Sequence, residues 1–295
     1  MLRFLLPALL LAMPAFAQIS ALPPEVQASI RSIGKSMDPE AVAATRAALA
    51  PLQPPPAVTP LSDIAYGTDP RHRLDVFSPG PGSRPVLVFV HGGGFVGGDK
   101  SSYENIGQWA ARSGLVGVNI TYRQAPAHVY PAVVEDIAAA LAWVRANISA
   151  HGGDPARIVL MGQSAGAAHV GDYLAAHYAS PGVASAMLVS GVHDVASFPP
   201  SPTTGAYYGT DRSVLAQRSA LPGLTRLTIP LFLTSTDLEP RPFQDQVARL
   251  NAALCMAGRC PPFLHMAGHN HFSTMWAIGS ADQELTVPLM ALANR

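Results

Sequence analysis

From about residue 61 onward, short apolar runs alternate with longer stretches in which apolar residues recur at helical spacing. The short runs have the length and composition of buried strands and lie at 85–90, 116–121, 157–161, 186–190, 231–235 and 262–265. The helical stretches between them include 132–148, 167–179 and 243–257. This alternation predicts an α/β fold, with a mostly parallel central sheet and helices on both faces.

Two further features precede the alternation. The sequence IAYGTDPRHRLDVFSP, residues 64–79, predicts an antiparallel hairpin around a Thr-Asp-Pro turn. Residues 18–60 carry helical signals at 25–33 and 39–49 and end in the proline-rich LQPPPAVTP. We therefore expect an N-terminal helical cap and linker, 18–60, followed by one α/β domain, 61–295.

The first 17 residues, MLRFLLPALLLAMPAFA, have the pattern of a secretory signal peptide. Arg3 precedes an apolar stretch at 4–13, and the AFA at 15–17 has the A-x-A form of a cleavage site. The stretch is too short to span a bilayer. We expect cleavage after Ala17, no stable membrane anchor, and a periplasmic or secreted protein. The alternative is a buried N-terminal helix.

Composition and cysteine usage narrow the possible partners. Charged residues are only 13% of the chain and the formal net charge is +0, so no basic face is expected and nucleic acid is not an expected partner. Cys255 and Cys260, in CMAGRC, are the two cysteines of the chain. In an oxidising compartment we expect them to form a local disulfide. A zinc site would need four ligands, and no second cysteine pair exists.

The glycine-rich run HGGGFVGGDKSS, residues 91–102, suggests binding of negative charge. A phosphate-binding loop needs a lysine directly after its last glycine, but Asp99 separates Gly98 from Lys100. The run also follows the strand-like PVLVFV. A His-Gly-Gly-Gly sequence in that place suits an oxyanion hole, in which backbone N–H groups stabilise a developing negative charge.

The nucleophile that an oxyanion hole requires is predicted at Ser164. GQSAG, residues 162–166, is a G-x-S-x-G motif between a strand-like run and a helical stretch, which is the context the motif needs. The small residues on both sides permit a sharp turn that exposes the serine Oγ.

An acid and a base are expected at the ends of the last two strands. Asp237 follows one strand-like run, with Glu239 as the nearest alternative, and His265, His269 and His271 follow the other. Ser164, Asp237, His271 is the serine, acid, histidine order found in α/β-hydrolases. We expect His271 to be the base and His269 to shape the loop. A metal site is not expected, because no carboxylate or cysteine cluster accompanies the histidines.

Together, HGGGF, residues 121–167 (TYRQAPAHVYPAVVEDIAAALAWVRANISAHGGDPARIVLMGQSAGA), SGVHDVASF, AYYGTD and GHNHFS resemble the α/β-hydrolase esterases related to hormone-sensitive lipase and to bacterial feruloyl-esterase-like carboxylesterases. The resemblance covers nearly everything from Ile64 onward. It implies an α/β-hydrolase fold, the triad Ser164, Asp237 and His271, and an oxyanion hole from the N–H groups of Gly93, Gly94 and Ala165. It also implies a structural role for Glu135 and Asp136. Gln163 departs from the acidic residue that often precedes the serine.

The expected activity is cofactor-free hydrolysis of a small-molecule ester, with small, aryl or short acyl groups, through an acyl-enzyme. Phe95, Tyr207 and Tyr208 are candidates for lining the substrate pocket, or else they pack in the core. One alternative is an arylformamidase-type amide hydrolase, although HGGGF argues mildly against it. The other is an inactive hydrolase fold used for binding, which usually lacks a triad residue.

Overall fold

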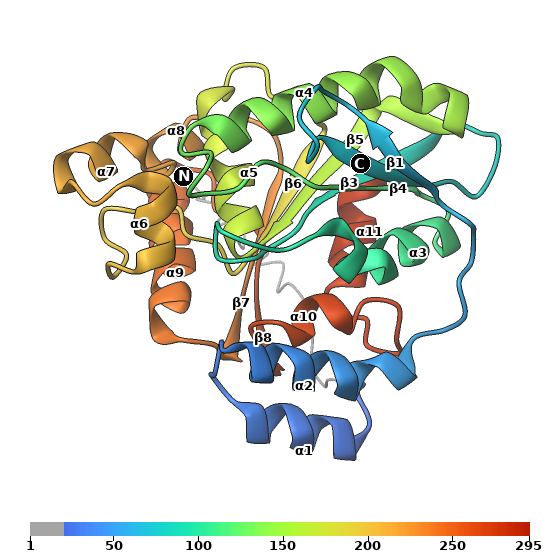
Figure 1. Cartoon of the computed structure of the whole chain (residues 1–295), viewed down its shortest axis with the longest axis horizontal. Coiled ribbons are helices and arrows are strands. Elements are labelled where there is room, and N and C mark those ends of the chain that lie inside the picture. Colours follow the sequence, from blue (N-terminus) through green and yellow to red (C-terminus); the bar gives the residue numbers. More distant parts are fainter. Residues whose placement is uncertain (1–20) are drawn as a thin grey trace, which may run out of the picture.

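Figure 1 shows the computed structural model of the chain, which describes residues 21–295. The predicted signal peptide and its cleavage site lie outside the described residues. Within that range eight strands form one sheet in the order β1-β2-β4-β3-β5-β6-β7-β8. The strands are β1 (Leu61–Ala65), β2 (Arg73–Phe77), β3 (Arg84–Val90), β4 (Val116–Ile120), β5 (Gly153–Gln163), β6 (Ser185–Val189), β7 (Leu231–Leu238) and β8 (Phe263–Asn270).

The sheet is parallel from β4 through β8, and β1 and β2 form the expected antiparallel hairpin at one edge. The predicted α/β fold with a mostly parallel sheet is therefore confirmed. The predicted runs agree with β3, β4 and β6 to within one residue at each end, whereas β5, β7 and β8 are longer than predicted. The extra length of β7 and β8 changes which residues lie at the carboxyl edge of the sheet.

Helices cover both faces of the sheet (Figure 1). They are α1 (Pro24–Ile33), α2 (Pro39–Leu49), α3 (Glu104–Arg112), α4 (Ala132–Asn147), α5 (Ala165–Ala176), α6 (Pro202–Tyr208), α7 (Arg212–Arg218), α8 (Leu221–Leu224), α9 (Arg241–Met256), α10 (Ser273–Trp276) and α11 (Thr286–Ala293). Buried side chains of α4, α5, α8 and α9 belong to one core layer, and those of α1, α3, α10 and α11 to the other.

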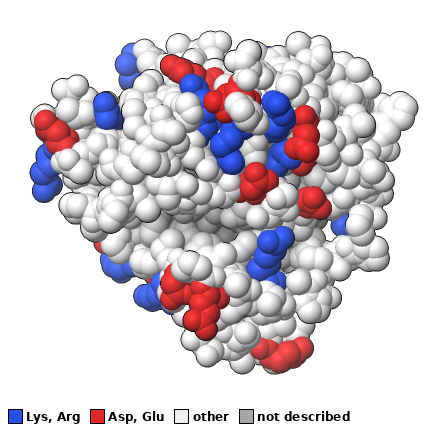
Figure 2. All heavy atoms as spheres, in the orientation of Figure 1, with Lys and Arg blue, Asp and Glu red and all other residues white. Residues whose placement is uncertain are grey.

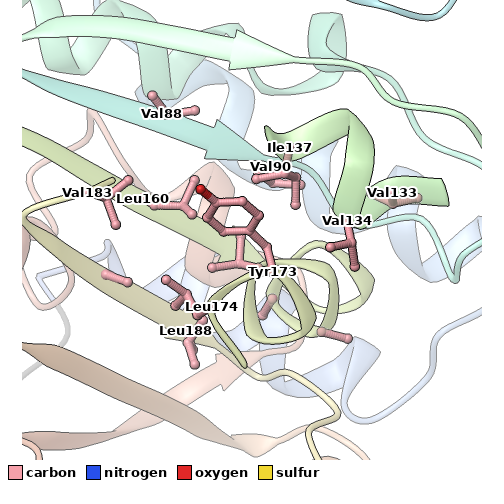
Figure 3. Close-up of a cluster of buried hydrophobic side chains, with 14 of the residues drawn as sticks. Val88, Val90, Val133, Val134, Ile137, Leu160, Tyr173, Leu174, Val183 and Leu188 are labelled. Atoms are coloured by element: carbon pink, nitrogen blue, oxygen red, sulfur yellow. The ribbon is translucent and has the colours of Figure 1, made fainter. Parts of the chain in front are cut away.

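The central strands read as continuous apolar runs because both of their faces are buried. In β3, Val86, Val88 and Val90 face one core layer, whereas Leu87 and Phe89 face the other. Figure 3 shows part of the first layer, where strand residues such as Val88 and Leu160 meet side chains of α4 and α5. This packing fixes the carboxyl ends of the strands, where the candidate site lies.

The N-terminal segment forms two helices, in agreement with the helical signals of the sequence. Asp38 caps α2 by accepting a hydrogen bond from the backbone N–H of Ala41 at 2.7 Å. Val26 and Ile30 of α1 join the same core layer as α10 and α11, and α1 packs against β8 (Figure 1). None of the helices within residues 21–295 is long and apolar enough to cross a membrane.

Cys255 and Cys260 are bonded to each other, with their Cα atoms 4.0 Å apart. The bond links the last turn of α9 to the segment that enters β8. The expected local disulfide is therefore present in the structure.

Candidate active site

Ser164 lies in a sharp turn between β5 and α5. Its backbone has φ 55° and ψ −124°, a conformation that non-glycine residues rarely adopt, and 7% of the residue is exposed. The turn requires glycine on both sides. A Cβ on Gly162 would lie 2.4 Å from the carbonyl oxygen of Gly166, and one on Gly166 would lie 2.2 Å from that of Val90. The motif therefore holds one serine in a strained position at the carboxyl edge of the sheet.

His271 directly follows β8 and is paired with a carboxylate. Its Nδ1 lies 2.9 Å from Oε2 of Glu239, and both side chains are almost fully buried. The other oxygen of Glu239 accepts a hydrogen bond from the backbone N–H of Thr236 at 3.0 Å. Because a carboxylate only accepts, the Nδ1 proton of His271 points to Glu239. Its Nε2 is buried without a hydrogen-bond partner among the described residues, and so can accept a proton.

The expectation that Asp237 contacts His271 is wrong, and the alternative, Glu239, occupies that place. β7 extends to Leu238, three residues beyond the predicted end, so Asp237 is still within the strand. Its Oδ1 accepts a hydrogen bond from the backbone N–H of Gly268 in β8 at 2.9 Å. Asp237 thus links the two strands, and the first carboxylate beyond the strand belongs to Glu239.

Gln163 connects the serine turn to the histidine loop. Its side chain is buried, and its Nε2 donates a hydrogen bond to the backbone carbonyl of His271 at 2.8 Å. Its Oε1 lies beside the glycine run, since a Cβ on Gly92 would be 2.5 Å away from it. An ionised carboxylate at this position could not donate that hydrogen bond. Gln163, which replaces the acidic residue often found before the serine, therefore holds the histidine loop in position.

Asn270 provides a second support for the histidine loop. Its Oδ1 accepts hydrogen bonds from the backbone N–H groups of Phe272 and Ser273 at 3.1 and 2.9 Å. Its Nδ2 donates to Oγ1 of Thr45 in α2 at 2.9 Å. Thr45 and Asn270 are both 0% exposed. An N-terminal helix therefore contacts the residue next to His271.

The glycine run passes directly beside the serine, as an oxyanion hole requires. A Cβ on Gly92 would lie 3.1 Å from the Cβ of Ser164. Gly93 and Gly94 have φ values of 145° and 60°, and a Cβ on Gly93 would lie 1.9 Å from the carbonyl oxygen of Gly97. Ala165 is the first residue of α5, so its N–H is among those left without an intrahelical partner. Gly92 and Ala165 thus lie beside Ser164, and Gly93 and Gly94 directly follow Gly92 in the chain; their role as oxyanion donors stays a prediction.

The lysine and the aspartate that follow the glycines make contacts within the protein. Nζ of Lys100 is bound by Oδ1 of Asp63 at 2.7 Å and by Oδ1 of Asp75 at 2.9 Å. Asp99 accepts a hydrogen bond from the backbone N–H of Ser101 at the start of the following helical turn. Burial lowers the pKa of His91 to about 4, so its imidazole is neutral near pH 7. The lysine and the aspartate therefore serve the local fold.

A family model described as alpha/beta hydrolase fold matches residues 87–272, which is more than half of the chain. The chain belongs to this family. A probable isoprenylcysteine alpha-carbonyl methylesterase of Arabidopsis thaliana is 43% identical over 106 residues, which are 35% of this chain and 25% of that protein. Carboxylesterase NlhH of Mycobacterium tuberculosis is 36% identical over 139 residues, which are 43% of this chain and 42% of that protein. The matched regions therefore span between a quarter and less than half of these relatives.

Solved structures extend the likeness to almost the whole chain. Esterase B from Lactobacillus rhamnosis has a TM-score of 0.72 at 18% identity, covering 92% of this chain and 94% of that one. The Pyrobaculum calidifontis esterase has a TM-score of 0.67 at 22% identity, covering 92% and 96%. At these identities the likeness establishes the fold of this chain and no more.

The other two histidines near the C-terminus, His265 and His269, lie outside the Glu239 pair. His269 is fully buried, with Nδ1 3.0 Å from Oγ of Ser273 and Nε2 3.0 Å from Oδ2 of Asp282. His269 therefore holds the loop that carries His271, as expected. Nδ1 of His265 lies 2.8 Å from Oγ of Ser235 in the neighbouring strand.

The prediction that Phe95, Tyr207 and Tyr208 line a substrate pocket is not supported, because all three are buried in the core. Their exposed fractions are 5%, 0% and 1%, and Phe95 packs against both tyrosine rings. The hydroxyl of Tyr208 donates to Oδ2 of Asp172 at 2.6 Å. The three residues therefore follow the alternative expectation, that they pack in the core. Burial also lowers the pKa of the neighbouring His169 to about 3, and that of His193 likewise to about 3.

Asp136 has the structural role that the family resemblance implied. Its carboxylate accepts hydrogen bonds from the side chain and the backbone N–H of Arg123 and contacts Nε2 of His72 at 2.8 Å. Glu135 also pairs with Arg123, at 2.9 Å. This network joins α4 to the hairpin.

Sequence reasoning missed two phenylalanines that contact the candidate base and a third that packs against one of them. The ring of Phe243 lies 4.5 Å from that of His271, and the ring of Phe272 lies 5.2 Å from it. Phe198 packs against Phe243 with ring centroids 5.2 Å apart. They come from α9, from the start of α10 and from the segment after β6. No spacing along the chain relates them, so no sequence pattern indicated that they meet.

Proposed function

We propose that this protein is a serine carboxylesterase that hydrolyses small-molecule esters through an acyl-enzyme. The observation that carries the proposal is the arrangement of His271. One ring nitrogen is held by buried Glu239, while the other is buried, unpartnered among residues 21–295 and on a loop tied to the serine turn by Gln163. This is the environment of a general base. The esterase names of the relatives support the same activity.

In the proposed reaction, Nε2 of His271 accepts the proton of Ser164 as Oγ attacks the ester carbonyl carbon. The carbonyl oxygen becomes an oxyanion that accepts hydrogen bonds from the N–H groups of Gly93, Gly94 and Ala165. Collapse of this intermediate breaks the bond to the alcohol oxygen, which leaves with the proton from His271. Glu239 stabilises the imidazolium without taking its proton.

The second half-reaction repeats these steps with water. Nε2 of His271 accepts one proton of the water as its oxygen attacks the acyl-enzyme, and the carboxylic acid leaves while the proton returns to Ser164 Oγ. An activated substrate such as a p-nitrophenyl ester is expected to show a burst if the second step is slower.

The test is covalent labelling combined with steady-state rates. A fluorophosphonate should add to a single peptide, the one that contains Ser164, and Ser164→Ala should lose both labelling and hydrolysis of p-nitrophenyl acetate. Ser213→Ala, which alters an exposed serine on α7, is the matched control. Turnover by folded Ser164→Ala within about tenfold of the parent would overturn the serine mechanism. Faster cleavage of N-formylkynurenine than of every ester tested would favour the formamidase alternative.

A further inference from the structure

Two aromatic rings contact the candidate base, and a third packs against one of them. Phe243 tilts by 49° over the ring of His271 at 4.5 Å, and Phe272 meets it edge-on at 5.2 Å and 89°. Phe198 continues the row by meeting Phe243 at 66° and 5.2 Å. We call Phe198, Phe243 and Phe272 the aromatic row. The aromatic row forms only when the chain folds, because its three residues come from separate elements.

The aromatic row differs from the core aromatic cluster in its exposure. Phe95, Tyr207 and Tyr208 are at most 5% exposed, whereas all three members of the row are half-buried and retain accessible ring area. The charged side chains nearest to Phe243 on α9, Arg241 and Asp245, are paired with each other at 2.7 Å. Figure 2 shows a hollow near the middle of one face, with Lys, Arg, Asp and Glu side chains around it rather than in it. Half-buried rings beside the candidate base favour contact with an apolar, flat ligand group.

The chemistry of the proposed reaction decides which part of the substrate reaches the row. The imidazole that accepts the serine proton gives it to the leaving alcohol oxygen, so the alcohol part must lie on the side of His271. The acyl part extends from the other side of the carbonyl carbon. We propose that Phe198, Phe243 and Phe272 form an alcohol-side subsite that selects esters of aromatic or flat apolar alcohols. This inference rests on the proposed esterase function.

The test varies the alcohol while the acyl group stays constant. Benzyl acetate, cyclohexylmethyl acetate and n-propyl acetate are all esters of alkyl alcohols. Their leaving alcohols are therefore similar to one another in acidity, whereas a phenol is a much more acidic leaving group. The parent enzyme should prefer benzyl over n-propyl acetate in kcat/KM by about tenfold, as expected of contacts with two or three rings. Moving the ring to the acyl side, as in ethyl phenylacetate compared with ethyl butanoate, should give a smaller preference.

Two substitutions test whether the aromatic row causes the preference for benzyl acetate. Phe198→Leu and Phe243→Leu should each lower the benzyl to n-propyl ratio roughly three- to fivefold, mainly by raising KM for benzyl acetate. Phe263→Leu is the matched control, since Phe263 is 44% exposed at the start of β8, the opposite end of the strand that leads to His271. It should leave the ratio unchanged. Circular dichroism of each variant checks folding, and two independent positions guard against one that fails to fold.

The outcomes separate this inference from the function it rests on. If the parent hydrolyses n-propyl acetate in a Ser164-dependent way but shows no benzyl preference, the subsite is refuted and the esterase stands. A benzyl preference that survives both row substitutions, or that Phe263→Leu removes equally, also refutes the subsite. If no ester is hydrolysed at all, the proposed function fails and the subsite with it.

Discussion

Replacing Glu239 by glutamine removes the charge beside His271 while keeping the length and volume of the side chain. The carboxylate is 2.9 Å from Nδ1 and fully buried, so solvent does not screen the pair. An amide N–H facing Nδ1 would favour the tautomer with its proton on Nε2, which cannot accept the serine proton. The corresponding substitution in a serine protease lowers kcat about 10⁴-fold, which corresponds to about 5.4 kcal/mol of activation free energy. We expect a loss of that order here.

Asp237→Asn is the matched control two residues away. The Asp237 carboxylate accepts one backbone hydrogen bond, from Gly268, and an asparagine carbonyl oxygen can accept it equally. We expect kcat to stay within about threefold of the parent and the free energy of unfolding to fall by about 1 kcal/mol or less. Glu239→Asp keeps the charge on a shorter side chain and should have intermediate activity.

The assay is the initial rate of p-nitrophenyl acetate hydrolysis for the four proteins at one slightly alkaline pH, with thermal melts to establish that each is folded. The reasoning predicts the order parent, Asp237→Asn, Glu239→Asp, Glu239→Gln. A folded Asp237→Asn that is inactive while Glu239→Gln keeps most of its activity would show that Glu239 is not the acid. The pairing with His271 would then lack a catalytic purpose.

Three further outcomes follow from the structure. In Gly94→Ala no atom lies within about 3.9 Å of the new Cβ, but the φ of 60° makes an alanine there cost about 1–2 kcal/mol of stability. The folded variant should lose up to about 100-fold in kcat with little change in KM, since the methyl crowds an oxyanion donor; an unchanged kcat would remove the run from the site. Thr45→Val should lower kcat severalfold, and Thr45→Ser should restore it, because the serine hydroxyl can again accept the hydrogen bond from Asn270. Equal kcat values for the two variants would show that Thr45 does not support the histidine loop. The lowered pKa values of the three buried histidines described above mean that stability is present above their unfolded pKa near about 6.5 and is lost as pH falls below it. Denaturant titrations from neutral pH to about pH 4 should therefore show falling stability, by up to about 1.4 kcal/mol per pH unit for each histidine, and a flat profile would refute neutral burial.

The fold could be predicted from the sequence because its signals are local. A strand buried on both faces must be apolar at every position, and residues 85–90 are so along their whole length. The serine turn was equally predictable, since no side chain larger than hydrogen fits at Gly162 or Gly166. Steric requirements of this kind restrict the residue type at a position, so they can be recognised in the sequence.

The carboxylate partner of His271 was not predictable to the residue because its position depends on where a strand ends. β7 and β8 pair with an irregularity between Thr236 and Leu238. A shift of one residue reverses the face to which a strand side chain points. Asp237 and Glu239 are both acceptable acids by chemistry, and only the extension of β7 through Leu238 separates them. The aromatic row was hidden for a related reason, since its members meet only after three separate elements are packed.

The N-terminal helices lie outside the region matched by the family model, yet they contribute to the position of the candidate base. Residues 87–272 contain Ser164, Glu239 and His271, but the loop next to His271 is held from two sides. Gln163 holds it from within that region, and Thr45 holds it from α2 through Asn270. If Thr45 were absent, Nδ2 of the fully buried Asn270 would lose its only recorded acceptor within residues 21–295, and a buried unpaired amide costs about 1–3 kcal/mol. Movement of the loop would expose the amide to a new hydrogen-bond partner, but it would also displace Nε2 of His271 from the serine. Removing residues 18–60 should therefore impair catalysis as well as stability, and we expect α1 and α2 to be required for full activity.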